Sequence, residues 1–172
     1  EADAAQTGYL VERWPCGLVI EVGPVPQGVV HPTILRQTRL ALEATLEVLA
    51  EARSGPLRLP RELVLHQHLC SLDLPRHGDG VPRAVIHPLR QGRDWQPLRP
   101  GDPLFLSDAG ETLRYEPGAG LGSDPVWPVF INEAAYGEKG IALSLTRRQG
   151  WPVPASWGEA LAQLAMNLIA AS

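Results

Sequence analysis

The sequence has little cysteine and no long apolar run. Its two cysteines, Cys16 and Cys70, have no spacing that indicates a disulfide, and a chain of 172 residues does not need one to fold. No segment approaches the roughly 18 apolar residues that cross a bilayer, and the start lacks the basic and apolar regions of a signal peptide. We therefore expect a soluble protein of a reducing compartment, the cytoplasm, with no membrane partner.

Excess positive charge is also absent. The formal net charge is -4, so no broad basic surface can neutralise a phosphate backbone, and nucleic acid is not an expected partner. Glycine and proline are plentiful, with 17 residues each, which predicts many turns around short strands. The hydrophobic fraction of 44% is ordinary for a globular chain and argues against disorder.

The first third of the chain reads as strand, loop and helix. The apolar run at residues 18–22 predicts a strand, and residues 32–53 predict an amphipathic helix with Pro32 in its first turn. Gly55 is expected to end this helix. A buried strand followed by such a helix is typical of a parallel α/β sheet. Because this strand has no neighbour in the sequence, we expect residues 1–55 to be the end of a domain that begins upstream.

The remainder is mostly β. Short alternating or β-branched segments predict strands at residues 62–72, 83–87, 103–106, 112–115, 126–131 and 141–146. A hairpin turn is expected at residues 108–110 and a flexible loop at 117–122. Ser156 begins a capping-box pattern ahead of a terminal amphipathic helix, whose apolar stripe we expect to pack on the same chain.

The predicted fold class is therefore α+β. We expect three parts: residues 1–55 as the C-terminal end of an α/β domain, residues 56–150 as a β-rich domain, and residues 151–172 as the terminal helix.

A signature and four further motifs resemble one protein family. Residues 20–29 read IEVGPVPQGV, and the later motifs follow in the family's order: residues 86–88 (IHP), 94–98 (DWQPL), 100–105 (PGDPLF) and 128–136 (PVFINEAAY). Together they resemble the aspartoacylase and succinylglutamate desuccinylase family, in its aspartoacylase branch, over about residues 9–146. The resemblance covers only the C-terminal part of such an enzyme.

The resemblance implies a zinc-dependent amidohydrolase that deacylates a small-molecule N-acyl amino acid, with N-acetylaspartate the leading substrate. It implies a carboxypeptidase-like first domain and a β-rich second domain. The family's zinc ligands, an H-x-x-E motif and a further histidine, are expected upstream of Glu1. We therefore expect one zinc per complete enzyme and no metal ligand or activity in this chain alone. The acyl group, the amino acid and the oligomeric state, including a homodimer, stay open.

Glu21 is the first candidate site residue. By resemblance it is the general base and acid that takes a proton from zinc-bound water and passes it to the leaving amine. A carboxylate at the end of an apolar run also fits a plain ion pair at a strand end. By the same resemblance, the hydroxyl of Tyr136 reaches the substrate carboxylate, and Glu133 supports the local hydrogen bonding. Without the motif, Tyr136 reads as a half-buried packing residue.

Tyr9 and Arg13 reproduce the spacing of a family Tyr-x-x-x-Arg pair. A guanidinium suits a substrate carboxylate because it can bind both oxygens. The pair lies about two residues closer to Glu21 than the family pattern, which leaves an ordinary surface role as the alternative.

The remaining patterns favour structural roles over metal binding or catalysis. His66, His68 and Cys70 alternate along a predicted strand, but a closed zinc site usually needs four ligands, so we do not assign a metal there. His87 is expected to make structural hydrogen bonds. Lys139 invites comparison with biotinyl or lipoyl carrier domains, although its context fits the family motif. A non-catalytic β-domain fragment or binding module with a structural role is the alternative function.

Overall fold

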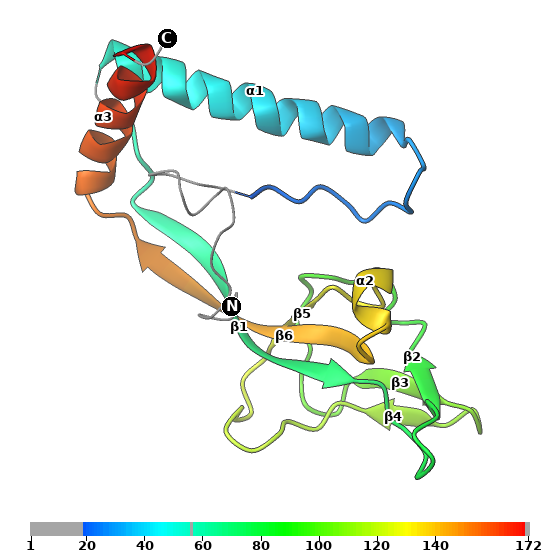
Figure 1. Ribbon diagram of the computed structural model, residues 1–172. Coiled ribbons are helices and arrows are strands. Elements are labelled where there is room, and N and C mark those ends of the chain that lie inside the picture. Colours follow the sequence, from blue (N-terminus) through cyan, green and yellow to red (C-terminus); the bar gives the residue numbers. More distant parts are fainter. Residues whose placement is uncertain (1–18, 56, 171–172) are drawn as a thin grey trace. The chain divides into compact units, whose positions relative to one another are not determined.

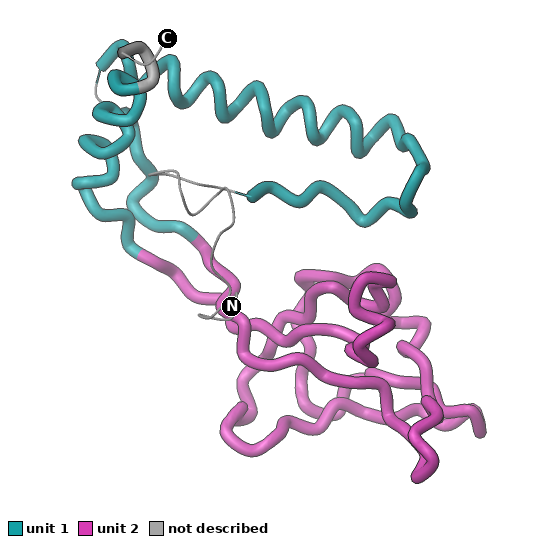
Figure 2. The backbone as a smooth tube through the Cα atoms, viewed as in Figure 1, with its two compact units in different colours: residues 1–63, 152–172 teal, residues 64–151 magenta. Residues whose placement is uncertain are grey.

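The computed structural model describes residues 19–55 and 57–170. The chain divides into two compact units, shown in Figure 2: unit 1 consists of residues 1–63 and 152–172, and unit 2 of residues 64–151. The terminal helix thus groups with the first segment of the chain. The three-part division expected from the sequence stays a prediction.

Unit 1 is built around two helices. Helix α1 spans Pro32–Ser54 and helix α3 spans Ser156–Ala170, close to the predicted limits. The side chain of His31 caps α1, because its Nδ1 accepts a hydrogen bond from the Thr33 amide at 3.3 Å. The two helices contact each other, and each contributes one buried alanine, Ala52 and Ala165. The small side chains allow the helices to approach closely.

The predicted strand at residues 18–22 is wrong for the residues that the structure describes. Residues 19–22 form no strand, and Val19 and Ile20 are 64% and 50% exposed. A strand requires a hydrogen-bonded neighbour, and the described part of the chain provides none for this segment. Glu21 therefore lies in an irregular segment that leads into α1.

Two three-stranded sheets, visible in Figure 1, lie mainly in unit 2, and the outer ends of β1 and β6 extend into unit 1. The first has the order β1-β6-β5, with β1 at Glu62–Asp73, β6 at Ile141–Pro152 and β5 at Trp127–Val129. The second is the antiparallel order β2-β3-β4, with β2 at Ala84–Ile86, β3 at Pro103–Ser107 and β4 at Thr112–Arg114. All six predicted strands are confirmed, with shifted ends.

The core of unit 2 lies among these strands. Leu98, Leu143 and Leu145 are fully buried, and Tyr115 is 2% exposed. Cys70 is a free thiol that packs against this cluster. The predicted hairpin turn joins β3 and β4, and Gly110 adopts a φ of 80° there, a conformation that favours glycine.

Every helix in the described part of the chain falls short of the length or apolar character of a membrane span.

Arg90 ties together three segments of unit 2. Its side chain is 12% exposed and donates to the Asp102 carboxylate at 2.6 Å. It also donates to the carbonyl oxygens of Pro103 at 3.2 Å and Pro97 at 3.3 Å. The Asp102 carboxylate accepts a further bond from the Arg99 amide at 2.9 Å. One guanidinium therefore fixes the loop that carries the motifs at residues 94–98 and 100–105.

Replacing this guanidinium should destabilise unit 2. We expect Arg90→Met to lower the free energy of unfolding by about 1–2 kcal/mol, because two carbonyls and a carboxylate lose their donor while Asp102 remains partly hydrated. Arg93→Met is the matched control. Among the described residues, the guanidinium of Arg93 bonds only the Gln96 side chain, so its loss should cost less than about 0.5 kcal/mol. Urea denaturation compares the stabilities of the two variants. Equal midpoints would show that the Arg90 side chain does not stabilise unit 2.

Candidate functional site

Glu21 lies ahead of the turn that introduces α1. In this turn the Val29 amide donates to the carbonyl of Pro26 at 3.1 Å, and Gly28 takes a φ of 78°. The side chain of Glu21 is exposed, and no described residue forms an ion pair with its carboxylate. The segment thus presents an exposed carboxylate without an ion-pair partner among the described residues. Tyr9 and Arg13 lie outside the described residues.

Tyr136 is held in unit 2 by a single helical turn. Helix α2 spans Ala134–Gly137, and the carbonyl of Glu133 accepts hydrogen bonds from the amides of Tyr136 and Gly137, both at 3.0 Å. The ring of Tyr136 lies 5.3 Å from the ring of Phe130, at an interplanar angle of 34°. Tyr136 and Glu133 are both half-buried. One side of the phenol is therefore packed, while part of the residue remains open to solvent.

The chain that leads to α2 is strained. In the described part of the chain, the non-glycine residues with positive φ are Trp95 at 64°, Phe130 at 56° and Asn132 at 57°. The Asp94 carboxylate accepts a hydrogen bond from the Ile131 amide at 3.1 Å. Residues held in such conformations cost of order 1–3 kcal/mol each and cluster at functional sites.

The strained residues belong to two segments that bind each other. The Trp95 amide donates to the Pro128 carbonyl at 2.9 Å, and the side-chain amide of Asn132 donates to Gln91 at 3.3 Å. The Asn132 amide also donates to the Ala142 carbonyl at 2.9 Å. Trp95, Phe130 and Asn132 were not candidate site residues on the sequence alone, although each lies inside one of the motifs described above. We define Phe130, Asn132, Glu133 and Tyr136 as the α2 corner.

His66 of β1 contacts two tryptophan rings. Its ring centroid is 4.9 Å from that of Trp95 and 6.1 Å from that of Trp127, both in edge arrangements. Nδ1 of His66 lies 3.1 Å from the hydroxyl oxygen of Thr146, and that hydroxyl donates to the Trp127 carbonyl at 2.6 Å. Burial, followed by the positive charge of Arg148, lowers the pKa of His66 from its ordinary value of 6.5. The neutral ring is therefore favoured at pH 7.

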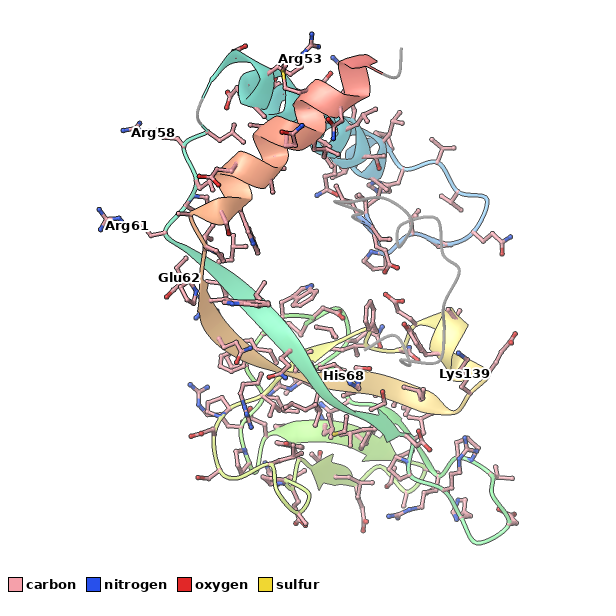
Figure 3. All side chains as sticks on the ribbon, turned by 60° about the vertical axis from the view of Figure 1, so that its left-hand side comes forward. Arg53, Arg58, Arg61, Glu62, His68 and Lys139 are labelled. Carbon is pink, nitrogen blue, oxygen red and sulfur yellow. The ribbon has the colours of Figure 1, made fainter. Side chains whose placement is uncertain are left out.

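The alternating array of His66, His68 and Cys70 does not converge. His68, labelled on β1 in Figure 3, is exposed, and its Nε2 lies 3.4 Å from the hydroxyl of Ser71. Cys70 instead packs against the core. Within residues 19–55 and 57–170, no group of three or more His, Cys, Asp or Glu side chains is placed to hold a metal ion.

The remaining candidates have local roles. His87 accepts a hydrogen bond from the Leu89 amide at 3.2 Å and lies 3.4 Å from the Thr112 hydroxyl, which confirms its structural assignment. His77 contacts the Asp108 carboxylate at 2.9 Å in an exposed pair. Lys139 follows α2, as Figure 3 shows, and its amide donates to the Tyr136 carbonyl at 3.0 Å.

Comparison with known proteins gives consistent matches. A model of the family described as "AstE/AspA barrel-sandwich hybrid domain" matches residues 61–148. The chain is 56% identical over 164 residues to a probable aspartoacylase of Parasynechococcus marenigrum (strain WH8102), covering 95% of this chain and 53% of the relative. It is 57% identical to a probable aspartoacylase of Prochlorococcus marinus (strain MIT 9313), with coverages of 95% and 52%.

A solved structure agrees with these matches. The crystal structure of murine aminoacylase 3 superposes with a TM-score of 0.66 at 39% sequence identity, covering 77% of this chain and 42% of that one. The chain thus spans about half the length of the curated relatives it matches.

Proposed function

The chain belongs to the AstE/AspA family, and on this premise we propose that it is the C-terminal portion of a zinc-dependent amidohydrolase acting on N-acyl amino acids. The observation that carries the proposal is the identity of more than half of the aligned residues to probable aspartoacylases. N-acetylaspartate, cleaved to aspartate and acetate, is the proposed substrate. We propose the cytoplasm as the location.

Zinc does not fit the described residues, because they bring no three potential ligands together. A hydrolytic zinc takes three protein ligands and keeps one position open for water. We therefore propose that the ligands belong to the part of the relatives that this chain does not span. A zinc bound there would supply an activated water.

Within this chain, Glu21 is proposed to accept and return a proton at the reacting centre. The hydroxyl of Tyr136 is proposed to donate a hydrogen bond to the substrate carboxylate, with Glu133 supporting it through the backbone of α2. Arg13 and Tyr9 are proposed to bind the same substrate, Arg13 through both oxygens of a carboxylate.

The exposed apolar surface of α1 supports the proposal that this chain is part of a larger protein. Leu35, Leu42 and Leu46 share one helical stripe and are 63%, 60% and 57% exposed. Burying a leucine is worth about 1.5–3 kcal/mol, so covering this stripe would stabilise the complete protein. The carboxypeptidase-like domain expected from the sequence is the proposed cover.

A substrate panel on the complete gene product tests the proposal. Acetate release from N-acetylaspartate should exceed release from N-acetylated aromatic amino acids, and it should also exceed succinate release from succinylglutamate. A complete protein that hydrolyses none of these would favour the non-catalytic reading. A different order of rates would support the proposed amidohydrolase activity but indicate another substrate.

A further inference from the structure

A row of side chains crosses the β1-β6-β5 sheet. Trp127 of β5 pairs with Thr146 of β6 in the strand register, and His66 of β1 contacts Thr146 from the other side. Arg148 follows Thr146 by two residues and so lies on the same face of β6. Trp95 packs against His66 from the neighbouring loop.

The hydrogen bonds fix the tautomer of His66. The Thr146 hydroxyl has one proton, and it is used in the short bond to the Trp127 carbonyl. Its oxygen must therefore accept from Nδ1 of His66, so Nδ1 carries a proton in the neutral ring. Nε2 of the neutral ring is then an acceptor with a free lone pair.

Nε2 is not fully buried. Among the described residues, the Tyr115 hydroxyl is the only buried side-chain polar atom without a hydrogen-bond partner, and Nε2 of half-buried His66 also has no protein partner there. Nε2 therefore has contact with solvent. Beside it, Trp95 is 56% exposed and held in a positive-φ conformation by the bond from its amide to Pro128. An exposed indole offers a flat apolar surface for a second ring.

The positive charge of Arg148 favours an anionic ligand. Arg148 lies on the same face of β6 as Thr146, and no described residue forms an ion pair with it. From this geometry we propose that His66, Trp95, Trp127 and Arg148 form a binding site for a small aromatic anion that carries an O–H or N–H donor. The donor bonds Nε2 of His66, the ring lies against Trp95, and the anionic group pairs with Arg148.

The test measures binding to the 172-residue chain, so it is independent of the proposed amidohydrolase activity. The probes are 4-hydroxybenzoate, benzoate, which lacks the donor, and phenol, which lacks the anion. Calorimetry should give one molecule of 4-hydroxybenzoate per chain, with about tenfold weaker binding of either control. Equal affinities for the three probes, or no binding at millimolar concentration, would overturn the proposal.

Substitutions of the site residues test each proposed ligand contact. His66→Phe should remove the preference for 4-hydroxybenzoate over benzoate, whereas His68→Phe on the same strand should keep it. Trp95→Gly, which suits the positive φ, should weaken both ligands. Nitrogen NMR of the His66 ring provides a measurement on the unaltered chain. Nε2 should shift on adding 4-hydroxybenzoate but not benzoate, and a spectrum without that shift contradicts the site.

Discussion

Glu21→Gln in the complete enzyme is expected to lower kcat by about a hundredfold to ten-thousandfold. General acid-base catalysis contributes an effect of this order, and glutamine keeps the shape of the side chain while it removes the carboxylate that holds the proton. Because Glu21 is exposed in an irregular segment, the change should leave the stability of the chain unaltered.

The control for Glu21 is Glu51→Gln, an exposed carboxylate on α1 that has no proposed role. Both variants are compared by steady-state kinetics with N-acetylaspartate, and the zinc content of each is measured. Zinc content should match the unaltered enzyme in both. If Glu21→Gln turns over as fast as Glu51→Gln, then Glu21 does not transfer the proton.

The second large effect is expected at Tyr136. Tyr136→Phe keeps the ring and its contact with Phe130 but deletes the hydroxyl. Loss of one hydrogen bond to a charged acceptor is worth roughly 1.5–3 kcal/mol, which lowers kcat/KM by about ten to a hundredfold. The melting temperature should change little because the packed side of the ring is preserved.

Tyr115→Phe provides the contrast for Tyr136. Tyr115 is 2% exposed in the core, and its hydroxyl has no hydrogen-bond partner among the residues that the structure describes, so removing that hydroxyl should leave kcat/KM unchanged. Kinetics of both variants with N-acetylaspartate separate a substrate contact from a general effect of losing a phenol. An unaltered kcat/KM in Tyr136→Phe would return this residue to a packing role.

The elements that depend on local chemistry were predictable. Helix α1 follows from the apolar spacing, Pro32 in the first turn and Gly55 after the last, all of which act within a few residues. The hairpin of β3 and β4 follows from Gly110, whose positive φ the turn requires. Helix α1 of unit 1 and this hairpin of unit 2 could therefore be predicted from the sequence alone.

The elements that depend on distant partners were not predictable. The strand at residues 18–22 failed because its apolar pattern says nothing about whether a neighbouring strand is present. The strained corner at Phe130 depends on Asp94, which binds the Ile131 amide from a separate segment. Helix α2 has four residues, too few for a periodic pattern. Tyr136 could be singled out only through the family motif.

The most direct test of the central claim is zinc content and N-acetylaspartate hydrolysis, measured side by side on the 172-residue polypeptide and the complete gene product. We expect one zinc per chain and turnover in the complete protein. In the 172-residue polypeptide we expect neither, because its described residues bring no three potential ligands together. One zinc per chain with turnover in the 172-residue polypeptide would contradict the account.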